Sequence, residues 1–171
     1  MQILHRVPSV LLLALLTTSG LAAESGGCGR FAWPIDAEAR LLNSSEKTAV
    51  TSGTELNPPP SGAILLTLTP WKSAALPMPP ERQPKSDTAF AGFVRVAGMT
   101  QPGVYKLSLS AEVWVDVIED GRYLKPTAFS GAPDCPGIRK SVKFQLGSGL
   151  KLIQISGAQL DTVALTLTPA P

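Results

Sequence analysis

The chain has 171 residues, of which 44% are hydrophobic, and it carries 15 basic and 13 acidic side chains. A formal charge of +2 excludes the strongly basic surface expected of a nucleic-acid-binding protein. The only histidine is His5, inside a predicted leader, so the rest of the chain has no imidazole for a Ser-His-Asp triad, a His-ligated zinc or a two-His iron site.

The N-terminal segment has the pattern of a secretory signal peptide. Arg6 gives a basic start, residues 10–16 form an apolar run, and small residues precede a cleavage site after Ala23. The run is too short to span a membrane and no second one follows, so we expect no transmembrane segment. The prediction is a signal peptide over 1–23 and one periplasmic or secreted domain over 24–171.

The two cysteines, Cys28 and Cys135, predict a disulfide, because an even pair in an exported chain is typical of a structural bridge. Closing so long a loop stabilises a fold by about 4–5 kcal/mol in the chain-entropy model. A lipid anchor on Cys28 is the alternative. The residues before it, Ser25-Gly26-Gly27, lack the leucine that such a signal usually carries.

Predicted elements follow in chain order. Residues 35–42 are compatible with one short helix, with Asp36 as its cap. Residues 43–61, which are polar and then proline-rich, and the proline-rich residues 75–87 predict long surface connections. Strands are predicted over 62–70, 89–98, 103–117 and 161–169, and a hairpin over 139–156 turning at 147–149. "LTLTP" occurs at 66–70 and 165–169. We interpret it as two strands that each end at proline rather than as a duplication.

The longest pattern lies in 103–117. Its odd positions are apolar from Tyr105 to Val117, and its even positions include Lys106, Ser108, Glu112 and Asp116. Such alternation is typical of a sheet with one buried face, and the length predicts a break near Ser110. The fold class predicted is all-β: a single antiparallel β-sandwich, with a jelly roll as its candidate topology, and long Pro-rich loops.

A hairpin is predicted after this strand, because Asp120-Gly121 favours a type I′ turn. A two-residue turn pairs Glu119 with Arg122, Ile118 with Tyr123, Val117 with Leu124 and Asp116 with Lys125. Pro126 must end the pairing. Glu112 is then the carboxylate without a local partner.

Trp114 is the main candidate binding residue, because alternation places it on the polar face; Glu112, Asp116 and Tyr123 complete the candidate site. A loop, or the "FAWP" segment at 31–34, covers the ring in one interpretation. In the others, Trp114 is an exposed platform for a sugar or peptide, or a contact with another protein.

Catalytic and metal-binding interpretations are weaker. Glu112 and Asp116 lie about 13 Å apart along a strand, beyond the roughly 5–9.5 Å that separates catalytic carboxylates in glycosidases. Glu119-Asp120 lacks the spacing of a calcium loop. We therefore predict no catalytic residue, no metal site and no cofactor. Arg139, Lys140 and Lys143 form a basic cluster that either holds an anionic partner or is a solvated strand end.

The segments "FAWPI", "GVYKLSLSAEVWVDVIEDGRYL", "DCPGIRKSVKFQLG" and "QISGA" together are similar to small exported bacterial proteins of unknown function. Some of those carry the name homogentisate 1,2-dioxygenase. The resemblance implies an uncharacterised β-sandwich. The dioxygenase family holds iron with two histidines and a glutamate, which residues 24–171 cannot supply, so no catalytic residue is carried over.

The hypothesis from sequence is an exported, non-catalytic domain that binds a glycan or another cell-envelope component. The alternative is a structural or accessory subunit that recognises another exported protein. A hydrolase or oxygenase is the third and least favoured class.

Overall fold

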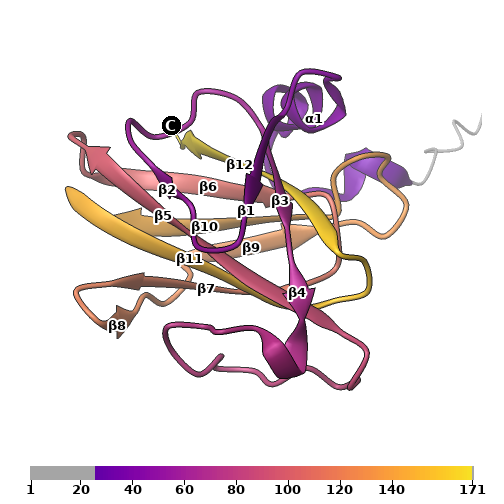
Figure 1. Ribbon diagram of the computed structural model, residues 1–171. Helices are drawn as coiled ribbons and strands as arrows, with labels where there is room; N and C mark the ends of the chain where they lie inside the picture. The colour runs from indigo at the N-terminus through magenta and orange to yellow at the C-terminus, as the bar shows by residue number, and fades with distance from the viewer. Residues whose placement is uncertain (1–25, 171) are drawn as a thin grey trace, which may run out of the picture.

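The computed structural model describes residues 26–170, so the predicted signal peptide over 1–23 lies outside the described residues. Two sheets pack face to face (Figure 1). The first sheet has the order β1-β3-β12-β6-β10-β9, and the second has the order β2-β5-β11-β7-β8 with β4 paired to β5. The all-β sandwich predicted from sequence is confirmed.

The strands of the first sheet are β1 (Thr48–Thr51), β3 (Ile64–Thr67), β6 (Gly103–Leu109), β9 (Ala128–Gly131), β10 (Lys140–Leu146) and β12 (Thr162–Pro169). Those of the second are β2 (Glu55–Leu56), β4 (Thr69–Pro70), β5 (Phe90–Met99), β7 (Trp114–Glu119), β8 (Arg122–Tyr123) and β11 (Gly149–Ala158). The helical elements are η1 (Gly27–Arg30), α1 (Asp36–Asn43) and η2 (Trp71–Ser73).

Two expectations about strand pairing are wrong. The sandwich is not purely antiparallel, because the edge pairs β1–β3 and β2–β5 are parallel. The hairpin predicted over 139–156 does not form either, since β10 lies in the first sheet and β11 in the second. The turn at 147–149 crosses from one layer to the other, and Gly149 has a φ of 95° there.

The predicted break in 103–117 is confirmed, and it is also a change of sheet. β6 ends at Leu109 in the first sheet and β7 begins at Trp114 in the second. The odd-numbered apolar residues keep facing one interior across this change. The largest fully buried apolar side chains of the core between the sheets include Phe144, Ile64, Leu66, Leu107, Leu109, Ile153, Ile155 and Leu165.

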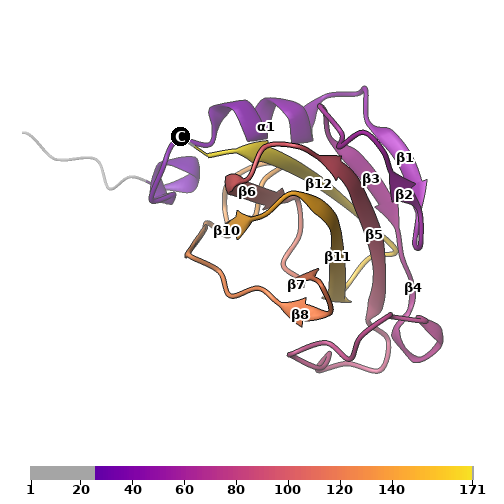
Figure 2. The same cartoon turned by 90° about the vertical axis from the view of Figure 1, so that its left-hand side faces the viewer.

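Helix α1 lies on the outer face of the first sheet, near β12 (Figure 2). It begins one residue later than predicted, so that Ile35 is the N-cap and Asp36 stands in the first turn, where a carboxylate favours the helix dipole. Its apolar side packs into a second cluster with Phe31, Ile138 and Ala164.

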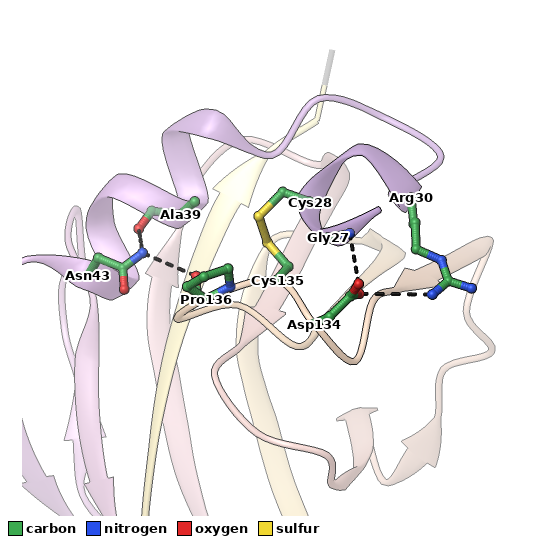
Figure 3. The surroundings of a disulfide bond; sticks show 8 residues. All are labelled: Gly27, Cys28, Arg30, Ala39, Asn43, Asp134, Cys135 and Pro136. Atoms are coloured by element: carbon green, nitrogen blue, oxygen red, sulfur yellow. Dashed lines mark hydrogen bonds and ion pairs between the residues drawn. A yellow bond between two sulfur atoms is a disulfide. The ribbon is translucent and has the colours of Figure 1, made fainter. Parts of the chain in front are cut away.

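The predicted disulfide between Cys28 and Cys135 is present and spans 107 residues of sequence (Figure 3). Around it, the Gly27 N–H donates to Asp134 Oδ2 (2.9 Å). The Asn43 amide at the end of α1 donates to Ala39 O (2.9 Å) and Pro136 O (3.4 Å). The bridge therefore fastens the N-terminal segment and α1 to the loop that precedes β10.

The "FAWP" segment covers the outer face of the first sheet. The Ala32 N–H donates to Ser130 Oγ (2.9 Å) and the Trp33 indole N–H donates to Ser141 Oγ (3.3 Å). Ser141 also shares a hydrogen bond of 2.9 Å with Ser108. Alternate polar positions of β6, β9 and β10 thus face this cover rather than solvent.

A buried ion pair also attaches α1 to the sheet. Glu38 is 1% exposed, and its Oε1 lies 2.6 Å from Lys106 Nζ and accepts from Thr168 Oγ1 at 2.7 Å. Burial opposes ionisation of Glu38, but the hydrogen bonds from Lys106 and Thr168 outweigh it and hold the pKa of this carboxyl below its usual value.

We expect Glu38→Gln to lower the free energy of unfolding by about 3 kcal/mol at pH 7, because Lys106 is left buried without a counter-charge. A depressed carboxyl pKa stabilises the fold above the ordinary glutamate pKa of about 4.3, and this contribution is lost as the pH falls through the folded-state pKa. Urea unfolding at pH 7 and pH 3 measures both effects. The difference between variant and wild type should shrink at pH 3, and the exposed Glu55→Gln should show neither effect.

Candidate functional site

Trp114 lies half-buried on the outer face of the second sheet, where a loop covers it. This loop, residues 74–89, is called the strap, and it connects η2 to β5 (Figure 2). It is the second of the two predicted proline-rich segments. Of the two predicted covers for Trp114, the strap is therefore the one observed, while "FAWP" covers the other sheet.

Polar side chains of the second sheet hold the strap in place. Asp116 Oδ2 accepts from the Glu81 N–H (3.3 Å), and Gln154 Oε1 accepts from the Met78 N–H (3.4 Å). Ser156 Oγ donates to Arg82 O (3.4 Å). The Tyr123 hydroxyl donates to Pro79 O. Tyr123 thus has a strap contact and does not line the cleft described below.

The Trp114 ring is fixed on two sides. Its indole N–H donates to Asp116 Oδ1 at 2.7 Å. Arg82 Cζ from the strap and Lys140 Nζ from β10 each lie 5.6 Å from the ring centroid. Two cations therefore contact the π system, an interaction worth about 0.5–2 kcal/mol each.

Asp116 is 3% exposed, and its predicted pairing with Lys125 is wrong. Lys125 forms an ion pair with Glu81 of the strap instead, at 2.6 Å. Burial raises the pKa of the Asp116 carboxyl despite the hydrogen bonds from Trp114 and Glu81. Asp116 thus joins the ring to the strap and is not a solvent-facing site residue.

The hairpin itself forms as predicted. Ile118 pairs with Tyr123 and Glu119 with Arg122, and the φ angles of Asp120 (50°) and Gly121 (70°) are both positive, as a type I′ turn requires. The ion pair of Glu119 is with Lys151, at 2.7 Å, rather than with Arg122.

Glu112, which has no local partner in the predicted hairpin, forms an ion pair with the distant Arg139 at 3.0 Å. The predicted basic cluster is consequently divided among three places. Arg139 pairs with Glu112, Lys143 Nζ lies 4.5 Å from the centroid of Trp33, and Lys140 points toward Trp114. It does not form one anion-binding patch.

A cleft of about 770 Å³ opens beside Trp114, between the last strands of the two sheets. Its volume is within the 300–1,000 Å³ range of small-molecule sites. The lining comes from the strap, β7, β9, β10 and the end of β11: Arg82, Gln83, Pro84, Lys85, Ser86, Ala89, Glu112, Val113, Trp114, Val115, Pro126, Ala128, Phe129, Lys140, Val142, Gly157 and Gln159.

The cleft exists because the sandwich is not closed along this side. Phe129 pairs with Val142 and so belongs to the inner face of the first sheet, yet it is 69% exposed. The opposite sheet ends in β8, a strand of two residues. Val113, Val115 and Val142 form the floor of the resulting opening.

The charge of the cleft is cationic. Arg82, Lys85 and Lys140 line it, against one carboxylate, Glu112, which forms an ion pair with Arg139. Lys140 Nζ donates to Val113 O at 2.9 Å. Burial lowers the pKa of Lys140; Glu112 opposes this shift and Arg82 adds to it.

Of the residues predicted from sequence, Trp114 and Glu112 line the cleft, Asp116 lies behind Trp114, and Tyr123 holds the strap. Sequence reasoning missed Phe129 and Arg82. Phe129 stands in a strand of four residues, too short to show alternation, and Arg82 is in a loop without periodicity. Over residues 26–170 there is no group of three or more acidic, His or Cys side chains placed to hold a metal, and no helix is long and apolar enough to cross a membrane.

Comparison of the chain with protein families, with curated proteins and with solved structures found no match.

Loss of the Asp116 carboxyl should release the strap. Asp116→Ala removes the acceptor of the Trp114 and Glu81 N–H groups, and unmade buried hydrogen bonds cost about 1–3 kcal/mol. Local opening of the strap should then rise about tenfold. Limited trypsin digestion followed by mass spectrometry would show faster cleavage after Arg82 and Lys85. The exposed Asp161→Asn serves as control, and equal cleavage rates in both variants would contradict this role of Asp116.

Proposed function

We propose that the protein is an exported, non-catalytic binding domain that holds a cell-envelope ligand in the cleft between β7, β9 and the strap. One observation carries this proposal: an aromatic side chain on the inner face of the sandwich, Phe129, is 69% exposed beside an opening of about 770 Å³. A large apolar side chain left exposed at a concave surface is typical of a ligand site.

Binding is favoured over catalysis by the engagement of the acidic side chains around the cleft. Glu112 is paired with Arg139, and Asp116 accepts hydrogen bonds from Trp114 and Glu81. A general acid or base has to reach a substrate atom and exchange a proton with it. Asp116 is 3% exposed and so is withheld from a substrate, while Glu112, whose side chain is 72% exposed, has an arginine rather than a second carboxylate as its partner.

Export is supported by the predicted signal peptide over 1–23 and by the Cys28–Cys135 disulfide. Disulfides persist in oxidising compartments such as the periplasm or the extracellular space. The ligand proposed is accordingly a component of the envelope or its surroundings. An envelope glycan is one such component.

Recognition of another exported protein is the second candidate. It is favoured by β9, an edge strand of four residues that carries the exposed Phe129 and whose outer side pairs with no other strand of residues 26–170. An extended segment of a partner could add to such an edge.

Phe129→Ser tests the site directly. We expect it to weaken binding of a soluble envelope fraction at least tenfold, because the largest exposed apolar surface of the cleft is lost, while stability changes little. Leu160→Ser is the matched control, since Leu160 is 68% exposed and does not line the cleft. Amide chemical-shift mapping of the ¹⁵N-labelled protein measures binding and places it on the molecule.

The size of the bound component separates the two candidates. A ligand that passes a 3-kDa filter supports the cleft site, whereas a retained protein that protects β9 from amide exchange supports the accessory role. Shifts confined to residues outside the cleft, or equal losses in both variants, would show that the proposed site is wrong.

A further inference from the structure

We infer that the ligand of the cleft is an anionic amphiphile, with its head between Arg82 and Lys140 and its apolar chain over the valine floor. The inference rests on the proposed function, since it assumes that the cleft is a binding site. It specifies the chemical class: a single apolar chain that carries a carboxylate or phosphate head.

The floor and walls favour an apolar chain. Val113, Val115 and Val142 line the inner end of the cleft and are 2–7% exposed, whereas Phe129 is 69% exposed and supplies most of the accessible apolar surface. None of these side chains offers a donor or acceptor. Each methylene that leaves water completely for such a surface raises affinity by about fourfold.

The cations favour an anionic head. Arg82 and Lys140 approach the same Trp114 ring, each at 5.6 Å from its centroid, and among the described residues neither has a carboxylate within ion-pair distance. Lys140 Nζ donates to Val113 O, and an ammonium group has three donors, so donors remain for a ligand. Burial already lowers the pKa of Lys140, and an anion would relieve that cost of burying charge.

A neutral glycan fits this geometry less well. The Trp114 indole N–H already donates to Asp116 Oδ1, so it is not free to donate to a sugar hydroxyl. Stacking of a sugar on Trp114 would compete with the two cations at its ring. A uronic acid has the anionic group but no apolar chain to cover the floor. Its binding therefore distinguishes recognition of the anion alone from recognition of an anionic amphiphile.

The experiment is titration of the ¹⁵N-labelled mature protein with octanoate, decanoate and dodecanoate below their micelle concentrations. Two matched probes are included: decanol has the apolar chain without the charge, and glucuronate has the charge without the apolar chain. We expect affinity to rise with chain length, by up to fourfold per methylene, and decanol to bind at least tenfold more weakly than decanoate. Shifts should centre on Trp114, Phe129 and Val142. Glucuronate should not bind.

Charge-removing variants test the head site. Lys140→Met keeps an apolar stem, and Arg82→Gln changes an exposed strap residue. Each should weaken decanoate binding about tenfold and leave decanol binding unchanged. Arg122→Gln, on β8 outside the cleft lining, should have no effect. If Lys140→Met does not fold, the effect of Arg82→Gln on decanoate binding alone tests the head site.

The outcomes separate this inference from the proposed function. If the envelope fraction shifts the cleft residues but decanoate does not, or if glucuronate binds as tightly as decanoate, the amphiphile is wrong and the binding cleft stands. If neither the envelope fraction nor any probe shifts the cleft residues, both are wrong.

Discussion

The structure depends on one constraint, the two-residue alternation of residues 105–117. It keeps the odd-numbered side chains inside the sandwich while the chain passes from the first sheet to the second. Leu107 and Leu109 leave β6 facing the core, and Val115 and Val117 enter β7 facing the same core. At the crossing, the Ser110 N–H donates to Ala164 O and Ser110 Oγ accepts from the Ala164 N–H, both at 3.0 Å. These bonds hold the point where the chain leaves the first sheet. They therefore determine which alternate residues of β7 face the core. Trp114 must then face outward, beside the opening whose floor its neighbours form.

The outward faces of both sheets are themselves covered, and polar side chains at the alternate positions attach the covers. Ser130 and Ser141 bind the N-terminal segment, while Asp116, Gln154 and Ser156 bind the strap. Neither cover contributes a strand to this contact, so its backbone groups need side-chain partners. A polar residue in a strand pattern, usually taken to face water, is here an attachment point. The buried Asp116 is the clearest case, since its raised pKa reflects the burial that this attachment entails.

Features that depend on a few neighbouring residues, such as turns, strand breaks and the short helix, could be predicted from the sequence. The turn at Asp120-Gly121, the break after Leu109 and the short helix at 36–43 follow from turn propensity and periodicity, and they were predicted within a residue or two. The disulfide followed from an even pair of cysteines in a chain predicted to be exported.

Sheet membership could not be predicted in the same way. Two strands joined by a glycine turn have the same apolar pattern whether they pair within a sheet or face each other across the core, as β10 and β11 do. Ion-pair partners were missed for a related reason. Glu112 pairs with Arg139 and Glu119 pairs with Lys151, and these partners come close only after the sheets form. Phe129 lies in a four-residue strand, so no periodicity indicated that it faces inward.

The cations of the cleft are positioned by backbone groups and an aromatic ring rather than by carboxylates. Ser156 holds the strap through Arg82 O, and Lys140 is held through its bond to Val113 O. Two like charges near one ring repel each other, and the π face offsets only part of that repulsion. A carboxylate between them would have supplied a counter-ion, as Glu112 does for Arg139. Over residues 26–170 neither Arg82 nor Lys140 has a carboxylate within ion-pair distance, so no ion pair has to break when an anion arrives, and this distinguishes them from the paired charges elsewhere in the sandwich.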